Sequence, residues 1–105
     1  MPTLVVLFNL KAGVSVSEYE NWARSTDLPI VNALPSVERF KIFRAGSVLG
    51  STVAPPYQFV ETIDLHDLTG LFNDISSPTM QKVASEFQAF ADQPIFMVCN
   101  SIEER

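Results

Sequence analysis

The spacing of apolar residues along this chain alternates between the period of a strand and the period of a helix. Two segments repeat apolar side chains every three or four positions, as amphipathic helices do, and a short helix is expected between 66 and 78. Four other segments have the alternation, or the β-branched and aromatic composition, of strands. The expected helices are 15–34 and 79–91, and the expected strands are 3–10, 36–49, 57–65 and 94–102. The order β-α-β-β-α-β predicts an α+β, ferredoxin-like fold with a four-stranded antiparallel sheet.

The length of the chain and its apolar content set the expected assembly. With 105 residues there is room for one core, so we expect residues 1–105 to form a single domain. The strands at 3–10 and 94–102 are apolar on both faces, so the sheet face without helices would expose a large apolar patch. A second copy packed sheet to sheet would cover that patch. The sequence therefore predicts a homodimer.

Charge and patterning disfavour several classes of partner. The net charge of −5 disfavours nucleic acid, which is bound through Lys and Arg, and it equally disfavours an anionic membrane surface. The apolar run near the N-terminus is too short to span a bilayer and has no basic flank before it. A single cysteine, Cys99, excludes an internal disulfide. We expect a cytoplasmic protein that binds neither nucleic acid nor membranes.

The chain lacks the familiar cofactor and nucleophile motifs. It has no Gly-rich nucleotide-binding loop, no Walker motif, no G-x-S-x-G and no HExxH. One histidine, His66, and one cysteine cannot build a structural zinc or haem-type site that needs several such ligands. A Cys99–His66 nucleophilic pair stays open, although a thiol among apolar strand neighbours is usually inert packing. No metal or organic cofactor is expected.

Glu61 is a candidate acid or base. It lies mid-strand between Phe59 and Ile63, on a face that ought to be buried. A buried carboxyl group needs a partner, or it acquires a raised pKa and serves as an acid or base. The structural alternative is an ion pair with Arg44 on the adjoining strand.

Further residues are candidates for contact with a small-molecule substrate. Trp22 falls on the apolar stripe of the first helix, and Tyr57 shares the face of Glu61. His66 follows the third strand, and Met80 is on the stripe of the last helix. Each has a plainer interpretation: core packing for Trp22, Tyr57 and Met80, and a surface position beside acidic neighbours for His66. With Arg44, these residues form the predicted substrate-binding set.

The stretch 24–40, "RSTDLPIVNALPSVERF", interrupts the first helix. Pro29 cannot donate a hydrogen bond to the carbonyl of Ser25, so the helix must kink or restart there. One interpretation is that Asp27 caps a second helical piece that starts at Pro29. The other is that the break directs Asp27 into a cavity between helix and sheet, as a catalytic carboxyl group. The two are compatible if each carboxyl oxygen takes one role.

This stretch resembles the helix-to-strand passage of EthD-like, dimeric α/β-barrel proteins, in which a histidine often stands where Asp27 does. "ALPSVERF" and "VETIDLHDL" are most similar to RedY/HapK-type proteins of prodigiosin-like pigment biosynthesis. The resemblance implies a homodimer whose two sheets form a barrel, with one small-molecule pocket per subunit. Related barrel cyclases use histidines at places that here read Leu4 and Met80.

Two functions follow as expectations from the resemblance and the residues together. The first is a cofactor-free enzyme of antibiotic or pigment biosynthesis, such as a cyclase, isomerase or monooxygenase-like enzyme. It would act on an apolar aromatic or pyrrole-type intermediate through Asp27 and Glu61. The second is a non-catalytic binding or accessory protein for an apolar intermediate of the same pathway.

Overall fold

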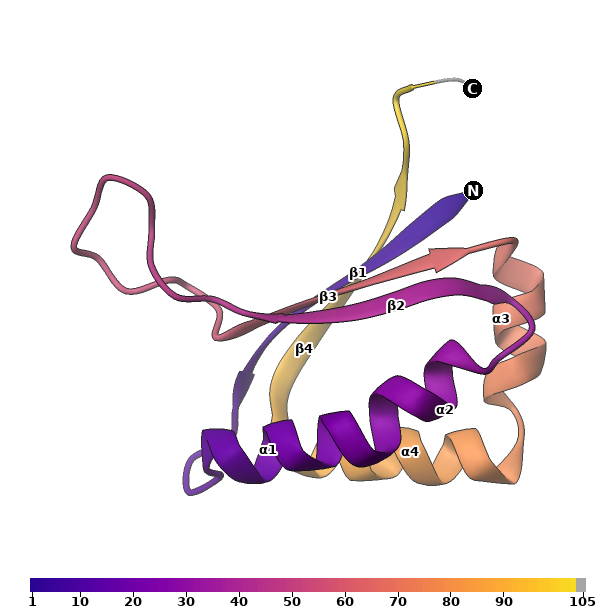
Figure 1. The fold of residues 1–105 in the computed structure, drawn as a ribbon, viewed down its shortest axis with the longest axis horizontal. Helices are drawn as coiled ribbons and strands as arrows, with labels where there is room; N and C mark the ends of the chain where they lie inside the picture. The colour runs from indigo at the N-terminus through magenta and orange to yellow at the C-terminus, as the bar shows by residue number, and fades with distance from the viewer. Residues whose placement is uncertain (104–105) are drawn as a thin grey trace.

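Four strands form one antiparallel sheet in the order β2-β3-β1-β4. The computed structural model describes residues 1–103. The strands are β1 (Pro2–Leu10), β2 (Val37–Arg44), β3 (Phe59–Leu65) and β4 (Ala91–Asn100). β1 is central and pairs with both β3 and β4, as Figure 1 shows. The α+β class and the predicted order of strands and major helices are confirmed.

The helices lie on one side of the sheet. α1 (Val16–Trp22), a π-helical segment η1 (Ala23–Asp27) and α2 (Leu28–Asn32) follow one another without a loop. α4 (Pro78–Phe90) runs beside them, and α3 (Leu68–Ile75) closes one end of this layer (Figure 1). The pocket expected between helices and sheet must therefore lie below the sheet in this view.

Side-chain caps explain where three of the helices begin. Ser15 accepts a hydrogen bond from the backbone N–H of Glu18 at 3.0 Å, which confirms one predicted helix start. Asp67 caps α3 through Gly70, and Ser77 caps α4 through the N–H of Met80. Each cap satisfies an N–H group that has no partner within its own helix.

The strand boundaries differ from those predicted. The second strand ends at Arg44 instead of 49, and the third begins at Phe59 instead of 57. Residues 45–58 form an exposed loop that extends away from the rest of the molecule (Figure 1), because its glycines and prolines disfavour regular pairing. β4 begins at Ala91 instead of 94, through an irregular stretch in which Gln93 has a φ of 45°.

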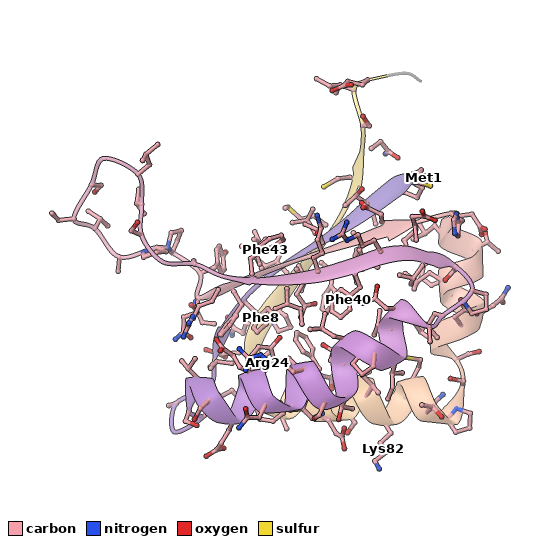
Figure 2. The ribbon with its side chains drawn as sticks, in the orientation of Figure 1. Met1, Phe8, Arg24, Phe40, Phe43 and Lys82 are labelled. Atoms are coloured by element: carbon pink, nitrogen blue, oxygen red, sulfur yellow. The ribbon has the colours of Figure 1, made fainter. Side chains whose placement is uncertain are left out.

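The two faces of the sheet are both rich in apolar residues. Toward the helices, Phe8 is fully buried and its ring packs against Tyr19, Phe59 and Phe87. On the opposite face the strand register places four apolar residues in one row across the sheet: Phe43, Val60, Leu7 and Ile95. Figure 2 shows Phe8 and Phe40 below the sheet and Phe43 above it.

Candidate functional site

The predicted helix interruption is a change of helix type. At η1 the backbone N–H of Leu28 donates to the carbonyl of Ala23, five residues earlier. Pro29 follows directly and has no N–H to donate, so the wider turn accommodates it without ending the helix. The helix is therefore continuous through Pro29, and π-helical turns of this kind are frequent at functional sites.

Asp27 is the last residue of this π-helical turn and is not a cap. Its backbone is helical, with φ −66° and ψ −54°, and its side chain makes no hydrogen bond within residues 1–103. The cap interpretation is therefore wrong. Only 5% of Asp27 is exposed, and this burial raises the pKa of its carboxyl group to about 7.

Glu61 lies on the buried face of β3, as the alternation predicted, and is 4% exposed. Its partner is the hydroxyl of Tyr19, which donates to Oε2 at 3.2 Å. Burial and the nearby charge of Asp27 raise the pKa of Glu61 to about 8, against the opposing effect of the Tyr19 hydrogen bond. The predicted ion pair with Arg44 is wrong, because Arg44 instead contacts Glu20 at the surface.

Tyr19, Asp27 and Glu61 form a buried acidic cluster, in which Tyr19 is hydrogen-bonded to Glu61 and the charge of Asp27 affects both of them. Tyr19 is fully buried, and burial together with the charges of Glu61 and Asp27 raises the pKa of its phenol. Tyr19 is not among the site residues predicted from the sequence. The available signal was a tyrosine three positions before Trp22 on the buried helix stripe, since a buried phenol needs a hydrogen-bond partner.

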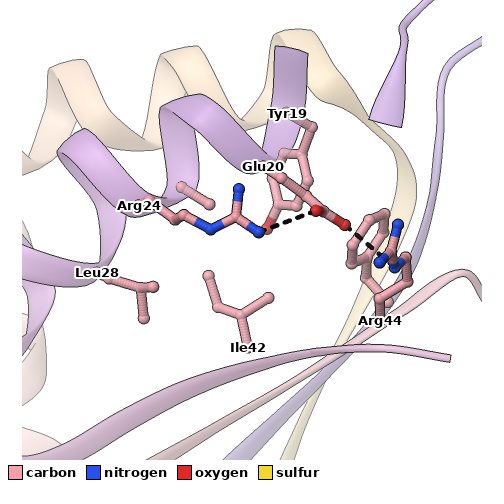
Figure 3. A pocket seen from close by; sticks show the side chains of 8 residues that line it. Tyr19, Glu20, Arg24, Leu28, Ile42 and Arg44 are labelled. Atoms are coloured by element: carbon pink, nitrogen blue, oxygen red, sulfur yellow. Dashed lines mark hydrogen bonds and ion pairs between the residues drawn. The ribbon is translucent and has the colours of Figure 1, made fainter. Parts of the chain in front are cut away.

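A hollow of about 170 Å³ opens between the first helix and β2 (Figure 3). Its lining is Tyr19, Glu20, Ala23, Arg24, Leu28, Ile42, Arg44 and Phe59. Drug-sized ligands usually occupy pockets of about 300–1,000 Å³, so this hollow suits a smaller group. Asp27 and Glu61 are not in the lining. Tyr19 belongs to both, so its phenol connects the hollow with the acidic cluster.

The mouth of the hollow carries two arginines and one glutamate, as Figure 3 shows. One oxygen of Glu20 lies 3.2 Å from Arg24, and the other lies 3.4 Å from Nε of Arg44. Of these three residues, only Arg44 was predicted from the sequence. The four-residue spacing of Glu20 and Arg24 was the signal for their contact.

The other predicted substrate-binding residues lie at different distances from this site. Trp22 packs its ring against Tyr19 and donates from its indole N–H to Glu86, 3.0 Å away. Tyr57 is in the 45–58 loop, outside β3. His66 contacts Glu38 at 3.1 Å on the surface. Met80 is buried in a core cluster with Val31, Phe40 and others. The structure thus brings Asp27 and Glu61 close enough to influence each other, with Trp22 against Tyr19 of the same cluster. Arg44 is at the mouth of the hollow, and Tyr57, His66 and Met80 belong to neither the cluster nor the lining.

Residues 1–103 contain neither a metal centre nor a membrane-spanning helix. No group of three or more His, Cys, Asp or Glu side chains is placed there to hold a metal ion. No helix in that range is long and apolar enough to cross a membrane.

Comparison with known families decides the membership of the chain. The sequence model of the REDY-like protein HapK matches residues 2–102. The chain belongs to the REDY-like HapK family. The crystal structure of HapK from Hahella chejuensis shares 22% identity, with a TM-score of 0.79 over 100% of this chain and 96% of that one. A search of curated proteins finds no match.

Other solved structures share the fold of this HapK-family chain at lower identity. An EthD-family protein from Bacillus halodurans has a TM-score of 0.75 and 15% identity, covering 97% of this chain and 99% of its own. SnoaB from Streptomyces nogalater, a cofactor-independent oxygenase, has a TM-score of 0.77 and 14% identity, covering 98% of this chain and 94% of its own. A dimeric ferredoxin-like protein from Thermobifida fusca has a TM-score of 0.69 and 18% identity, covering 93% of this chain and 88% of its own.

Proposed function

We propose that this HapK-family chain is a cofactor-independent acid–base enzyme of secondary metabolism. Its substrate would be an aromatic or pyrrole-type intermediate of prodigiosin-like pigment biosynthesis. Family membership supports the pathway, and the fold shared with a cofactor-independent oxygenase is compatible with catalysis by side chains alone. The observation that carries the proposal is the burial of two carboxyl groups that influence each other, Asp27 and Glu61, in a cluster that shares Tyr19 with the lining of a hollow.

Buried carboxyl groups are costly to the fold, which is why this pair points to chemistry. With pKa values of about 7 and 8, both groups exchange protons near neutral pH, where acid–base catalysis is most effective. In the proposed roles, Asp27 is the base and Glu61, protonated at pH 7, is the acid, and protons pass between this cluster and the substrate through the hydroxyl of Tyr19, which also lines the hollow. Tyr19 positions Glu61 and faces the hollow, while Trp22 and Arg44 shape the surroundings.

A second candidate is a non-catalytic binding or accessory protein for the same class of intermediate. The lining of the hollow favours it, because neither Asp27 nor Glu61 contributes to the surface that a ligand would touch. Under this proposal the acidic cluster only tunes the packing beneath the ligand. The two candidates differ in what the loss of a carboxyl group does to turnover.

We also propose that the protein acts as a homodimer of single-domain subunits packed sheet to sheet. The row of apolar residues across the helix-free face supports this assembly, since Phe43 and Ile95 are 48% and 42% exposed in one copy. The related fold from Thermobifida fusca is described as dimeric. A second copy would remove this apolar surface from water.

Pigment restoration tests the proposed function. The gene for this chain is expressed in a prodigiosin-producing host that lacks its own HapK-type protein, beside Asp27→Asn, Glu61→Gln and Glu38→Gln. Glu38→Gln is the matched control, because it removes a surface carboxyl group that contacts His66, away from the hollow. We expect the wild type and the control to restore pigment. The two cluster variants should form pigment about 100-fold more slowly, because one acid or base usually contributes a factor of this size.

The possible outcomes separate the candidates. Full restoration by both cluster variants would contradict catalysis and favour the accessory protein. Failure of the wild type to restore pigment would contradict the pathway. Melting temperatures of the purified variants, measured at neutral pH, show whether a loss of pigment is a loss of fold.

A further inference from the structure

The mouth of the hollow is positively charged in a chain that is acidic as a whole. The chain carries seven Lys and Arg residues against twelve Asp and Glu. Two of the seven, Arg24 and Arg44, flank this one hollow from different elements, η1 and β2. Glu20 is the only carboxylate in the lining and faces both of them (Figure 3). The local charge of the mouth is therefore opposite in sign to that of the molecule.

The two arginines keep most of their hydrogen-bonding capacity. Their side chains are 67% and 62% exposed, and Glu20 engages one nitrogen of each at 3.2 and 3.4 Å. A guanidinium group has five N–H donors, so each arginine can hold a second carboxylate beside Glu20 or in its place. Arg24 and Arg44 thus form a clamp for an anion, and Glu20 occupies the place of that anion.

Below this clamp the hollow is apolar. Leu28 and Ile42 lie beside each other below the side chain of Arg24 in Figure 3, and Phe59 is the third large apolar residue of the lining. A volume of about 170 Å³ matches one aromatic ring better than a larger ligand. A ligand that fits both the two arginines at the mouth and the apolar residues below them has a flat apolar ring and one anionic group at its edge.

We infer that the hollow binds a single-ring aromatic or heteroaromatic carboxylate, with the ring against Leu28, Ile42 and Phe59 and the carboxylate between Arg24 and Arg44. This inference rests on the proposed function for a ring-binding site and adds the anionic group. The ligand carboxylate competes with Glu20 for the two arginines. Its ring then lies over Tyr19, next to the acidic cluster.

Binding of pyrrole-2-carboxylate, compared with pyrrole-2-carboxamide, tests the inference. The two probes share size and ring and differ in charge. Backbone amide NMR titrations of the full chain reach about 10 mM, enough to saturate a site with a Kd near 1 mM. We expect the carboxylate to bind at least about fivefold more tightly, with shifts centred on Ala23, Arg24 and Ile42.

Three variants sharpen the test. Arg24→Gln and Arg44→Gln should each weaken carboxylate binding by about two- to fivefold, the range of an exposed ion pair. Glu20→Gln should strengthen it, because the competing carboxylate is gone. The matched controls are Lys82→Gln, whose side chain points away from the sheet in Figure 2, and Glu18→Gln on the exposed side of α1. Both should bind the carboxylate as the wild type does.

Equal binding of the two probes would overturn the inference and leave a neutral ring-binding site, and so the proposed function, intact. Absence of binding by both would overturn it as well, while the pigment test of Asp27 still decides the proposed function independently. Unchanged affinity in both arginine variants would place the carboxylate elsewhere. Because both arginine side chains are exposed, their replacement should leave the fold intact, so weaker binding would not reflect unfolding. The amide spectra of the variants show directly whether each is folded.

Discussion

Asp27 and Glu61 make the stability of the fold depend on pH in a direction opposite to that of salt-bridged acids. In the unfolded chain both carboxyl groups ionise near pH 4. In the folded chain burial holds their pKa values at about 7 and 8. The folded state therefore binds more protons between these limits, and the contribution of both groups to stability falls as pH rises from about 4 to about 8.

Replacing one carboxyl group by its amide should remove the part of this pH dependence that comes from that group. We expect Asp27→Asn and Glu61→Gln to be close to wild type near pH 4. Above pH 8 they should be more stable than wild type, by on the order of 2–4 kcal/mol. Urea unfolding across this range measures the difference, with Glu38→Gln as a surface control. A constant difference at all pH values would contradict the assigned pKa shifts.

The hydroxyl of Tyr19 opposes part of the pKa shift at Glu61, because its hydrogen bond favours the charged carboxylate. Tyr19→Phe should therefore raise the pKa of Glu61 further, which carboxyl-carbon NMR titration can follow. Tyr57→Phe, in the exposed 45–58 loop, is the matched control and should leave that titration unchanged. A lower pKa of Glu61 in Tyr19→Phe would refute the role of the hydrogen bond.

Helices and strands were predictable from the sequence where a local pattern is compatible with only one structure. The alternation of β3 placed Glu61 on the buried face, and the first helix begins where it was predicted, with Ser15 as its cap. Pro29 predicted an interruption, but a kink, a restart and a π-helical turn can each accommodate a residue without a backbone N–H. Only the packed structure selects the π-helical turn.

Contacts between distant elements lay beyond sequence analysis. The hydrogen bond from Tyr19 to Glu61 joins residues 42 positions apart, and nothing local to either strand or helix encodes it. The direction of Arg44 is a similar case. Its position on the strand next to Glu61 suggested an ion pair between the two. However, β2 ends at Arg44, and the long side chain of Arg44 reaches Glu20 at the mouth of the hollow.

The N-cap of α4 offers a test of the helix boundaries. Ser77 accepts a hydrogen bond from the N–H of Met80 at 3.2 Å, and Ser77→Ala should lower the free energy of unfolding by about 1 kcal/mol. Ser85→Ala, on the exposed middle of the same helix, should be neutral or slightly stabilising because alanine favours helix interiors. Chemical denaturation compares them, and equal effects would argue against the cap.

The molecule as a whole has one sheet face covered by helices and one face without them. On the uncovered face Phe43, Val60, Leu7 and Ile95 form a continuous row. Val5 and Met97 lie in the next row, so the apolar area extends over β1 and β4. Such a surface is what sheet-to-sheet association of two copies requires.

A charge in this row should prevent association. Phe43→Asp is expected to give a monomer at concentrations at which the wild type is a dimer, because pairing would bury two carboxylates. Phe72→Asp places the same change on α3, where the ring is 60% exposed, and should remain dimeric. Sedimentation equilibrium gives both masses. A monomeric wild type would refute the proposed dimer.

The π-helical turn at Ala23–Asp27 also bears on how such a site could arise in evolution. Its hydrogen bond spans one residue more than an α-helical bond does. It therefore has the form of an α-helix that has gained a single residue. One inserted position rotates all that follows by about 100° relative to all that precedes. A one-codon insertion would thus be enough to move a carboxyl group such as that of Asp27 between solvent and interior, without altering the helix on either side.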